Sequence, residues 1–267
     1  MSFAERYGPW AVVAGASEGT GRAFARKIAA NGVPCILIAR REAPLAALAA
    51  EIRAESGVTC VTAAIDLTSP DAPKQIFAAA GDREVGLFVS NAGADTNGSR
   101  FLDRDIDAWL DHVHLNVITT MSCCHHFGKL MRARGKGGLL LVNSGACYGG
   151  ASFMATYSAS KVFVLNFGEA LWAELRPHGV DVLNLVLGRT DTPAFRKLLA
   201  EKGMPVPPDL ASPDDVAEMG LTRLPDGPIH NWGLPDDVAG YAPSSAAARR
   251  SRILAIDAAT KQIYGDR

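Results

Sequence analysis

The sequence predicts an α/β fold, a doubly wound parallel sheet of about seven strands with helices on both faces. Short apolar runs alternate with stretches of helical periodicity, which is the pattern of right-handed strand–helix–strand crossovers. The runs are continuously apolar, as strands buried on both faces should be. The length of 267 residues and the hydrophobic fraction of 48% suit one α/β domain with a large core. In such a fold the ligand crevice lies beyond the carboxyl ends of the strands.

The expected elements can be placed in order along the chain. Helices are expected over residues 22–31, over the Ala-rich run 43–54, and from Pro213, with Ser212 as its N-cap. Residues 193–209 contain three prolines after the first and predict a mobile helical flap. A C-terminal helix is expected over residues 244–264. The seven expected strands are residues 10–14, 35–39, 58–66, 85–90, 139–143, 180–186 and 227–232.

Three glycines follow the first expected strand, at Gly15, Gly19 and Gly21, and a helix comes next. Glycine permits a sharp turn and lets a diphosphate approach bare amides at a helix N-terminus, where the helix dipole favours an anion. The spacing is GxxxGxG and not the commoner GxGxxG, and glycine clusters also mark ordinary tight turns. The loop indicates dinucleotide binding, with a simple turn as the alternative.

The second expected strand ends in Arg40 and Arg41. An NAD-binding fold places an acidic residue about 20 positions beyond the glycines, where it binds the ribose 2′-hydroxyl. A guanidinium group at that place attracts a 2′-phosphate instead. The sequence therefore favours NADP(H), although two arginines at a strand end can also be plain solvated charge.

Tyr157 and Lys161 are spaced by four and share one face of a predicted helix. A phenol has a pKa of about 10, and a nearby positive charge lowers that pKa because it favours the phenolate. The pair therefore suits proton transfer near neutral pH. Taken alone, the pair is weak evidence, because a Tyr and a Lys at this spacing are usually two residues on a solvated helix face.

From about residue 8 to about residue 232 the chain resembles a classical short-chain dehydrogenase/reductase (SDR). The features above occur together with Ser144, which precedes Tyr157 by thirteen residues, and with Asn116 in a long helix. Asp66-Leu67 ends the third expected strand and Asn91-Ala92-Gly93 closes the fourth. The resemblance implies a single Rossmann-fold domain over residues 1–267, with a substrate flap at 190–211 and a C-terminal extension at 233–267. From Asp214 onward the chain is similar to the ketoacyl-CoA-reductase and 17β-hydroxysteroid-dehydrogenase-like branch.

The resemblance also implies a set of catalytic roles. Tyr157 would give a proton to the carbonyl oxygen while Ser144 donates a second hydrogen bond. Lys161 would lower the phenol pKa and bind the nicotinamide ribose, and Asn116 would support a water chain that returns the proton. The residues expected to bind the cofactor are Gly15, Ser17, Glu18, Gly19, Thr20, Gly21, Arg40, Arg41, Asp66, Leu67, Asn91, Ala92, Gly93, Tyr157, Lys161, Gly188, Thr190 and Thr192.

The chain departs from the family pattern at two places. Glu18 stands in the glycine loop where some NADP-dependent relatives carry a basic residue, so Arg40 and Arg41 must carry the cofactor preference. After the sixth strand the family usually has Pro-Gly, whereas this chain has Leu187-Gly188 followed by Arg189. Arg189 either points to solvent or contributes to phosphate binding.

The expected function is an NADP(H)-dependent carbonyl reductase acting on an apolar ketone. Two alternatives stay open: a catabolic alcohol dehydrogenase working toward oxidation, and a non-catalytic NADP(H)-sensing protein that retains the fold. The side chains that favour an apolar pocket, with core packing as the alternative, are Phe153, Met154, Phe195, Leu198, Met204 and Trp232.

Other patterns exclude several classes of function. The net charge of −1, without a sustained basic tract, argues against nucleic acid or an anionic membrane as partner. Residues 123–126 read Cys-Cys-His-His, but consecutive helical residues fan out and cannot converge on one metal ion, so no metal is expected. His112 and His114 are expected at the surface or at an interface. The five cysteines without a CxxC and the absence of a long apolar run predict a cytoplasmic protein. The family resemblance implies a homodimer or homotetramer.

Overall fold

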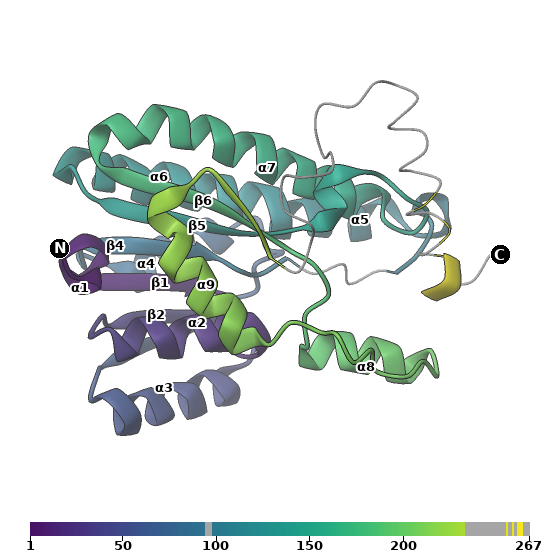
Figure 1. Cartoon of the computed structure of the whole chain (residues 1–267), viewed down its shortest axis with the longest axis horizontal. Helices are drawn as coiled ribbons and strands as arrows, with labels where there is room; N and C mark the ends of the chain where they lie inside the picture. The colour runs from purple at the N-terminus through teal and green to yellow at the C-terminus, as the bar shows by residue number, and fades with distance from the viewer. Residues whose placement is uncertain (94–97, 233–254, 256–257, 259–260, 264–267) are drawn as a thin grey trace.

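The seven strands of the computed structural model form one parallel sheet in the order β3-β2-β1-β4-β5-β6-β7 (Figure 1). The structure describes residues 1–93, 98–232, 255, 258 and 261–263. All seven expected strands are present, and the doubly wound prediction is confirmed. Their bounds are β1 (Trp10–Ala14), β2 (Cys35–Ala39), β3 (Cys60–Ala64), β4 (Val85–Ser90), β5 (Gly137–Ser144), β6 (Val180–Leu187) and β7 (Ile229–Trp232).

Helices cover both faces of this sheet and bury a separate apolar cluster on each (Figure 1). One face carries α2 (Gly19–Ala30), α3 (Glu42–Ser56) and α9 (Pro213–Arg223), and the other carries α4 (Ala72–Ala80), α6 (Thr119–Arg134) and α7 (Ala155–Leu175). The inner strands are covered on both faces, since every residue of β2 and β4 is buried. Within residues 1–93 and 98–232, the remaining helical segments are α1 (Phe3–Tyr7), α5 (Ile106–Val113), α8 (Pro193–Glu201), η1 (Phe101–Asp103), η2 (His114–Ile118), η3 (Gly145–Tyr148), η4 (Arg176–His178) and η5 (Leu224–Asp226).

Some boundaries differ from the sequence-based expectation. The third strand was expected over residues 58–66, but β3 lies at the sheet edge and pairs with β2 alone, over five residues from Cys60 to Ala64. Strand β5 begins earlier than expected, at Gly137, because Gly137 and Gly138 already pair with Val180 and Asp181 of β6. The helix expected at 244–264 and the extension 233–267 lie largely outside the described residues.

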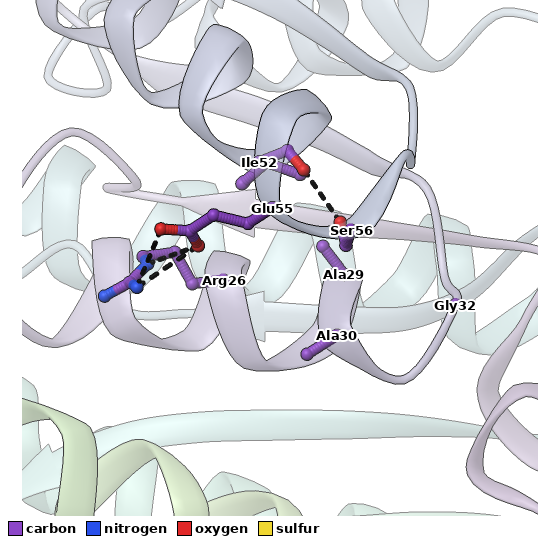
Figure 2. Close-up of a pocket in the computed structure, with 7 residues that line it drawn as sticks. All are labelled: Arg26, Ala29, Ala30, Gly32, Ile52, Glu55 and Ser56. Carbon is purple, nitrogen blue, oxygen red and sulfur yellow. Dashed lines mark hydrogen bonds and ion pairs between the residues drawn. The ribbon is translucent and has the colours of Figure 1, made fainter.

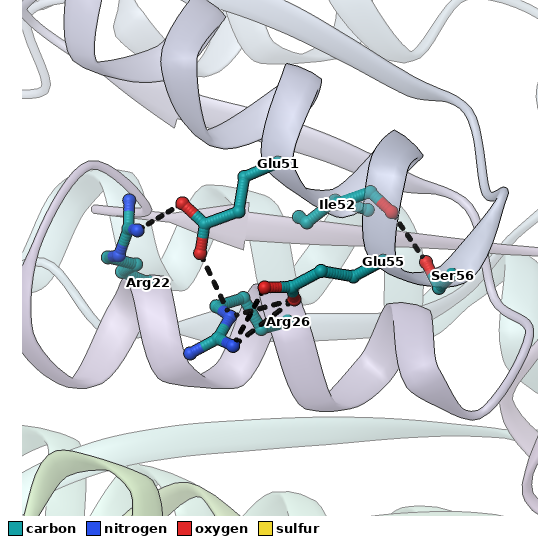
Figure 3. A network of polar contacts seen from close by, with 6 residues as sticks. All are labelled: Arg22, Arg26, Glu51, Ile52, Glu55 and Ser56. Carbon is teal, nitrogen blue, oxygen red and sulfur yellow. Dashed lines mark hydrogen bonds and ion pairs between the residues drawn. The ribbon is translucent and has the colours of Figure 1, made fainter.

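Helices α2 and α3 are joined on their exposed side by a network of ion pairs (Figure 3). Glu51 accepts from both Arg22 and Arg26, with 3.1 Å between Arg26 Nε and Glu51 Oε1. Arg26 also pairs with Glu55 at 3.1 Å. A cavity of about 250 Å³ lies beside Arg26 and Glu55, at the end of α2 away from the glycine loop (Figure 2). Its position between two helices makes it a packing gap and separates it from the crevice at the strand ends.

The sheet order reverses between β1 and β4, and this point positions the site. The amides of Asn91 and Ala92, just after β4, donate to the carbonyl of Ala14 at the end of β1, at 3.1 and 2.9 Å. The amides of Gly15 and Ala16 donate to Ile38 of β2, at 2.8 and 3.0 Å. The ends of three neighbouring strands are thereby held together at the switch point, where ligands bind in folds of this kind.

Within the described part of the chain, no helix combines the length and hydropathy needed to cross a membrane.

Candidate active site

The glycine loop is packed against the end of β4 so tightly that it excludes a side chain. A Cβ placed on Gly21 would lie 1.9 Å from the carbonyl oxygen of Gly15. Asn91 holds this arrangement, since its Nδ2 donates to that same oxygen at 3.0 Å and its Oδ1 accepts from Thr20 Oγ1 at 2.6 Å. Gly15 has a φ of +85°, a conformation that favours glycine. The loop therefore presents backbone amides, at the N-terminus of α2, to the space beyond β1.

The two arginines expected to bind a phosphate border this loop. Arg40 and Arg41 follow β2 directly, and both are exposed. Arg41 Nη2 lies 2.6 Å from Glu18 Oε2 across the mouth of the loop. The residue that departs from the family pattern is thus an ion-pair partner of one of the two cations.

The pair predicted from the Tyr157–Lys161 spacing does share one face of α7. Lys161 Nζ lies 5.6 Å from the centre of the Tyr157 ring. The Tyr157 side chain is half-buried, whereas Lys161 is only 5% exposed. Lys161 Nζ donates to the Val142 carbonyl of β5 at 3.2 Å, which ties the helix to the strand that ends in Ser144.

Ser144 ends β5, with its hydroxyl oxygen turned onto the following 3₁₀ turn. Its Oγ accepts from the Ala146 amide at 3.2 Å, so the hydroxyl hydrogen stays available to donate elsewhere. Asn143 fixes this position: its Oδ1 accepts from the Ser144 amide at 2.8 Å and its Nδ2 donates to the Lys161 carbonyl at 3.2 Å. The sequence reasoning missed Asn143. A polar residue ending an otherwise apolar strand was the available signal.

Asn116 lies in a π-helical turn, η2, that interrupts the long helix the sequence predicts around it. Such turns are frequent at functional sites. Its Nδ2 donates to the His112 carbonyl at 3.1 Å, whereas its buried Oδ1 has no hydrogen-bond partner among the described residues. A Cβ placed on Gly93 would lie 2.5 Å from that Oδ1 and 3.0 Å from Lys161 Nζ. The structure thus brings Asn116 and Lys161 together beneath the backbone of Gly93.

The expectation for His112 is wrong. Its side chain is 2% exposed and packs within the chain, with its ring centre 5.9 Å from that of Tyr157. The inward direction follows from helical geometry, because His112 lies one turn before Asn116 and so shares its face. His114 is half-buried.

The flap begins against the glycine loop. A Cβ on Gly19 would lie 3.1 Å from Thr192 Cγ2, and Thr192 caps α8 by accepting from the Phe195 amide at 3.2 Å. The base of the flap is closed by a bridge between Thr190 and Ala211. Arg189 is exposed and pairs with Asp209 at 2.8 Å, which favours its solvent-facing alternative.

Four other residues are expected to bind the cofactor: Asp66, Leu67, Ser17 and Gly188. Asp66 is exposed and its carboxylate accepts from both the amide and the hydroxyl of Thr68, at 3.1 and 2.9 Å. Leu67 is buried and its carbonyl accepts from Thr119 at 3.1 Å. Ser17 and Gly188 are half-buried at the ends of β1 and β6.

The Cys-Cys-His-His run fans out around α6. Cys123 and Cys124 are buried in the core, and His126 stacks on Phe77 with ring centres 4.0 Å apart. Within residues 1–93 and 98–232, no three His, Cys, Asp or Glu side chains are grouped as metal ligands.

Burial lowers the pKa of Lys161 to about 8, an effect that the nearby Cys147 thiol opposes. The ammonium group is therefore held in the folded protein at a cost. That cost is fully present below pH 8 and disappears as the pH rises toward 10.5, where the unfolded chain also loses its proton.

We expect Lys161→Met to raise the free energy of unfolding by about 2–3 kcal/mol at pH 7, with the gain shrinking between about pH 8 and pH 10.5. Denaturant unfolding across this pH range measures the difference from the wild type. Lys129→Met, at an exposed position of α6, is the control and should show no such pH-dependent gain. A Lys161→Met variant that is less stable by the same amount at every pH would contradict the expectation.

Comparison with known proteins agrees with this geometry. The family model described as short chain dehydrogenase matches residues 9–203. The chain is 31% identical over 226 residues to a 7β-hydroxysteroid dehydrogenase of Collinsella aerofaciens, covering 84% of this chain and 86% of the relative. It is 36% identical over 190 residues to a very-long-chain 3-oxoacyl-CoA reductase of Laccaria bicolor, covering 68% of this chain and 55% of the relative.

Two solved structures extend the comparison. A 7β-hydroxysteroid dehydrogenase superposes with a TM-score of 0.80 at 28% identity, covering 86% of this chain and 90% of the other. A short-chain dehydrogenase from Sphingobium yanoikuyae, in complex with NADPH, superposes with a TM-score of 0.75 at 25% identity, covering 97% and 96%. The structural similarity thus extends over most of the chain.

Proposed function

Because this chain belongs to the short-chain dehydrogenase/reductase family, we propose that it is an NADP(H)-dependent carbonyl reductase acting on an apolar ketone. Oxidoreduction at a CH–OH group is the activity of the family. The observation that carries the proposal is the meeting of Asn116 and Lys161 beside Gly93, with the Tyr157 ring centre 5.6 Å from Lys161 Nζ. A catabolic dehydrogenase would use the same groups, but nothing in the site favours oxidation over reduction.

The residues present fit a dinucleotide carrying a 2′-phosphate. The glycine loop runs into the N-terminus of α2, where unpaired amides and the helix dipole favour a diphosphate, and at Gly15 and Gly21 its backbone packs too closely to admit a Cβ. Arg40 and Arg41 provide exposed positive charge at the neighbouring strand end. Near the catalytic groups, the buried Asn116 Oδ1 is an acceptor without a protein partner in the described chain. A polar ligand or a water held beneath it would satisfy that oxygen.

When bound, the reduced nicotinamide supplies a hydride to the carbonyl carbon of the substrate. Negative charge then develops on the carbonyl oxygen, and the protein must stabilise that charge. Tyr157 donates its phenolic proton to this oxygen and so completes the alcohol. Ser144 donates a second hydrogen bond, because its hydroxyl hydrogen stays free to donate while its Oγ accepts from the Ala146 amide.

Lys161 prepares Tyr157 for this role. Its ammonium group, 5.6 Å from the ring centre, favours the phenolate and so makes the phenol a better proton donor. Because burial brings the Lys161 pKa down to about 8, the group can also exchange a proton near neutral pH. Asn116, whose Oδ1 shares the space beneath Gly93 with Lys161 Nζ, would order a water that returns the proton.

Apolar side chains near Tyr157 support an apolar substrate. Phe153 lies four residues before Tyr157 and holds a φ of +67°, a conformation that costs a non-glycine residue roughly 1–3 kcal/mol. Its ring is buried beneath the guanidinium of Arg100, at 5.3 Å.

Half-buried Phe195 and Leu198 on α8 point to the flap as the other apolar wall. Trp232 packs against the core instead, so it follows the core-packing alternative. The names of the relatives, a hydroxysteroid dehydrogenase and a very-long-chain 3-oxoacyl-CoA reductase, refer to large apolar substrates.

The proposed function is tested by NADPH oxidation with a panel of ketones graded in size and polarity. We expect turnover to rise with the apolar bulk of the ketone, and to favour steroid, aryl or long-chain keto compounds over small polar ones. Cofactor binding without turnover anywhere on the panel would support the sensing alternative. Faster oxidation of the matching alcohols with NADP⁺ at neutral pH would support the catabolic one.

We also propose that the chain assembles as a homodimer or homotetramer through α5, α6 and α7. Large apolar side chains are exposed there, including Ile106 at 59%, Leu110 at 50% and Leu130 at 43%. Phe163 is 37% exposed and stacks on Phe167 of the same helix. Symmetric association would bury these side chains. Light scattering that finds a monomer at all concentrations would contradict this assembly.

A further inference from the structure

The ion pair between Glu18 and Arg41 joins the glycine loop to the end of β2, two segments that are proposed to bind the cofactor. Glu18 belongs to the glycine loop and immediately precedes α2, whereas Arg41 follows β2 and immediately precedes α3. Their side chains are 45% and 60% exposed, with 2.6 Å between Glu18 Oε2 and Arg41 Nη2. The backbone fixes this closeness, because Gly15 and Ala16 are hydrogen-bonded to Ile38 of β2.

An anion that approaches Arg41 therefore meets the Glu18 carboxylate that is already paired with it. It either displaces that carboxylate from the guanidinium or binds beside it, and both carry an electrostatic cost. Arg40 differs, because it is exposed and no carboxylate of the described chain is within ion-pair distance of it. The two arginines are thus unequal, one available to a phosphate and one already partly neutralised.

We propose that Glu18 is a residue that sets cofactor selectivity, weakening the preference for a 2′-phosphate so that the site accepts NAD(H) as a second cofactor. This rests on the proposed function. A 2′-phosphate carries close to two negative charges and is repelled by a neighbouring carboxylate. A ribose 2′-hydroxyl carries none and can donate a hydrogen bond to it. The Glu18 carboxylate therefore weakens the binding of NADP(H) and permits the binding of NAD(H), whereas Arg40 favours NADP(H).

The size of the effect follows from exposure. Exposed charges a few ångströms apart interact weakly, and salt screens them, so removing one carboxylate changes binding of a doubly charged phosphate by about three- to tenfold. We expect Glu18→Gln to tighten NADPH binding by about fivefold at low salt and to leave NADH binding within about twofold.

The experiment measures dissociation constants for NADPH and NADH by the fluorescence of the bound nicotinamide, without substrate. Wild type, Glu18→Gln and Glu218→Gln are compared. Glu218→Gln is the matched control, because Glu218 is also an exposed glutamate in a single ion pair, 2.9 Å from Lys27, but lies on α9. Competition by 2′,5′-ADP and by 5′-ADP repeats the comparison on the adenosine half alone.

Support consists of measurable NADH binding by the wild type and a selectivity ratio that rises in Glu18→Gln and not in Glu218→Gln. The inference is overturned by an equal ratio in the two variants, or by weaker NADPH binding in Glu18→Gln, which would mean that Glu18 orients Arg41 for the phosphate. A wild type that binds neither dinucleotide overturns the proposed function as well. Binding of both dinucleotides without turnover of any ketone overturns the carbonyl reductase alone, and the ratio still decides on Glu18.

Discussion

Tyr157→Phe should lower kcat for ketone reduction by at least about 10³-fold while leaving NADPH affinity within about threefold. The change removes one hydroxyl and keeps the ring, so the contact with the Lys161 ammonium and the packing against His112 persist. The proposed proton donor is lost, and in the proposed mechanism the charge on the carbonyl oxygen would be stabilised by Ser144 alone. Steady-state kinetics and fluorescence titration of NADPH measure the two quantities.

The matched control is Tyr7→Phe, which removes a phenolic hydroxyl from the opposite end of the sheet. Tyr7 donates to Asp181 at 2.8 Å and belongs to the core cluster on the α2 side. Its loss should reduce stability by about 1 kcal/mol and leave kcat unchanged. If Tyr157→Phe kept more than a tenth of wild-type kcat, another group would have to be the proton donor.

Gly21→Ala should weaken NADPH binding by at least about 100-fold and lower the free energy of unfolding by about 3 kcal/mol. The added Cβ would lie 1.9 Å from the Gly15 carbonyl oxygen and 2.5 Å from Asn91 Nδ2. Because the first of these atoms belongs to the backbone, the loop must move away from the start of α2. That movement breaks the Asn91 hydrogen bond to Gly15 and takes the loop amides out of position for a diphosphate.

Gly128→Ala is the control for this substitution. Gly128 is also helical and buried, but a Cβ there meets Leu139 at 3.6 Å and Leu175 at 3.7 Å, which are ordinary contacts. We expect unchanged NADPH binding and equal or slightly higher stability, since alanine favours a helix. Calorimetry and NADPH titration of both variants make the comparison. Normal cofactor binding by Gly21→Ala would show that the diphosphate does not depend on this loop.

The sequence predicts much of the fold because each local signal in it agrees with the others. Seven apolar runs, the glycine loop and the helix begun by Ser212 all appear where expected, and Ser212 does cap α9 by accepting from the Asp215 amide at 3.4 Å. The spacing of Tyr157 and Lys161 predicts a shared helical face, and the structure has them on one. Boundaries were less predictable where pairing partners set them, as at the one-sided edge strand β3.

Features that depend on contacts between distant residues could not be read from the sequence. Helix α1 is bound to β6 by Arg6 and Tyr7, which both contact Asp181, more than 170 positions along the chain. The π-helical turn at Asn116 leaves no mark in the apolar periodicity, because it changes the backbone hydrogen bonds and not the composition. The ion pair of Glu18 with Arg41 likewise joins two loops that only the sheet order brings together.

The flap is attached at its own base. Between Pro193 and Leu210 it contains none of the four proposed catalytic residues. The bridge from Thr190 to Ala211 and the Arg189–Asp209 ion pair close it as a unit. If α8 forms the proposed apolar wall, substitutions along it would reshape that wall without removing the hydrogen bonds of Asn143 to the Ser144 amide and the Lys161 carbonyl. In the proposed enzyme, evolution of this segment would then change which ketones are reduced while the chemical reaction stays the same.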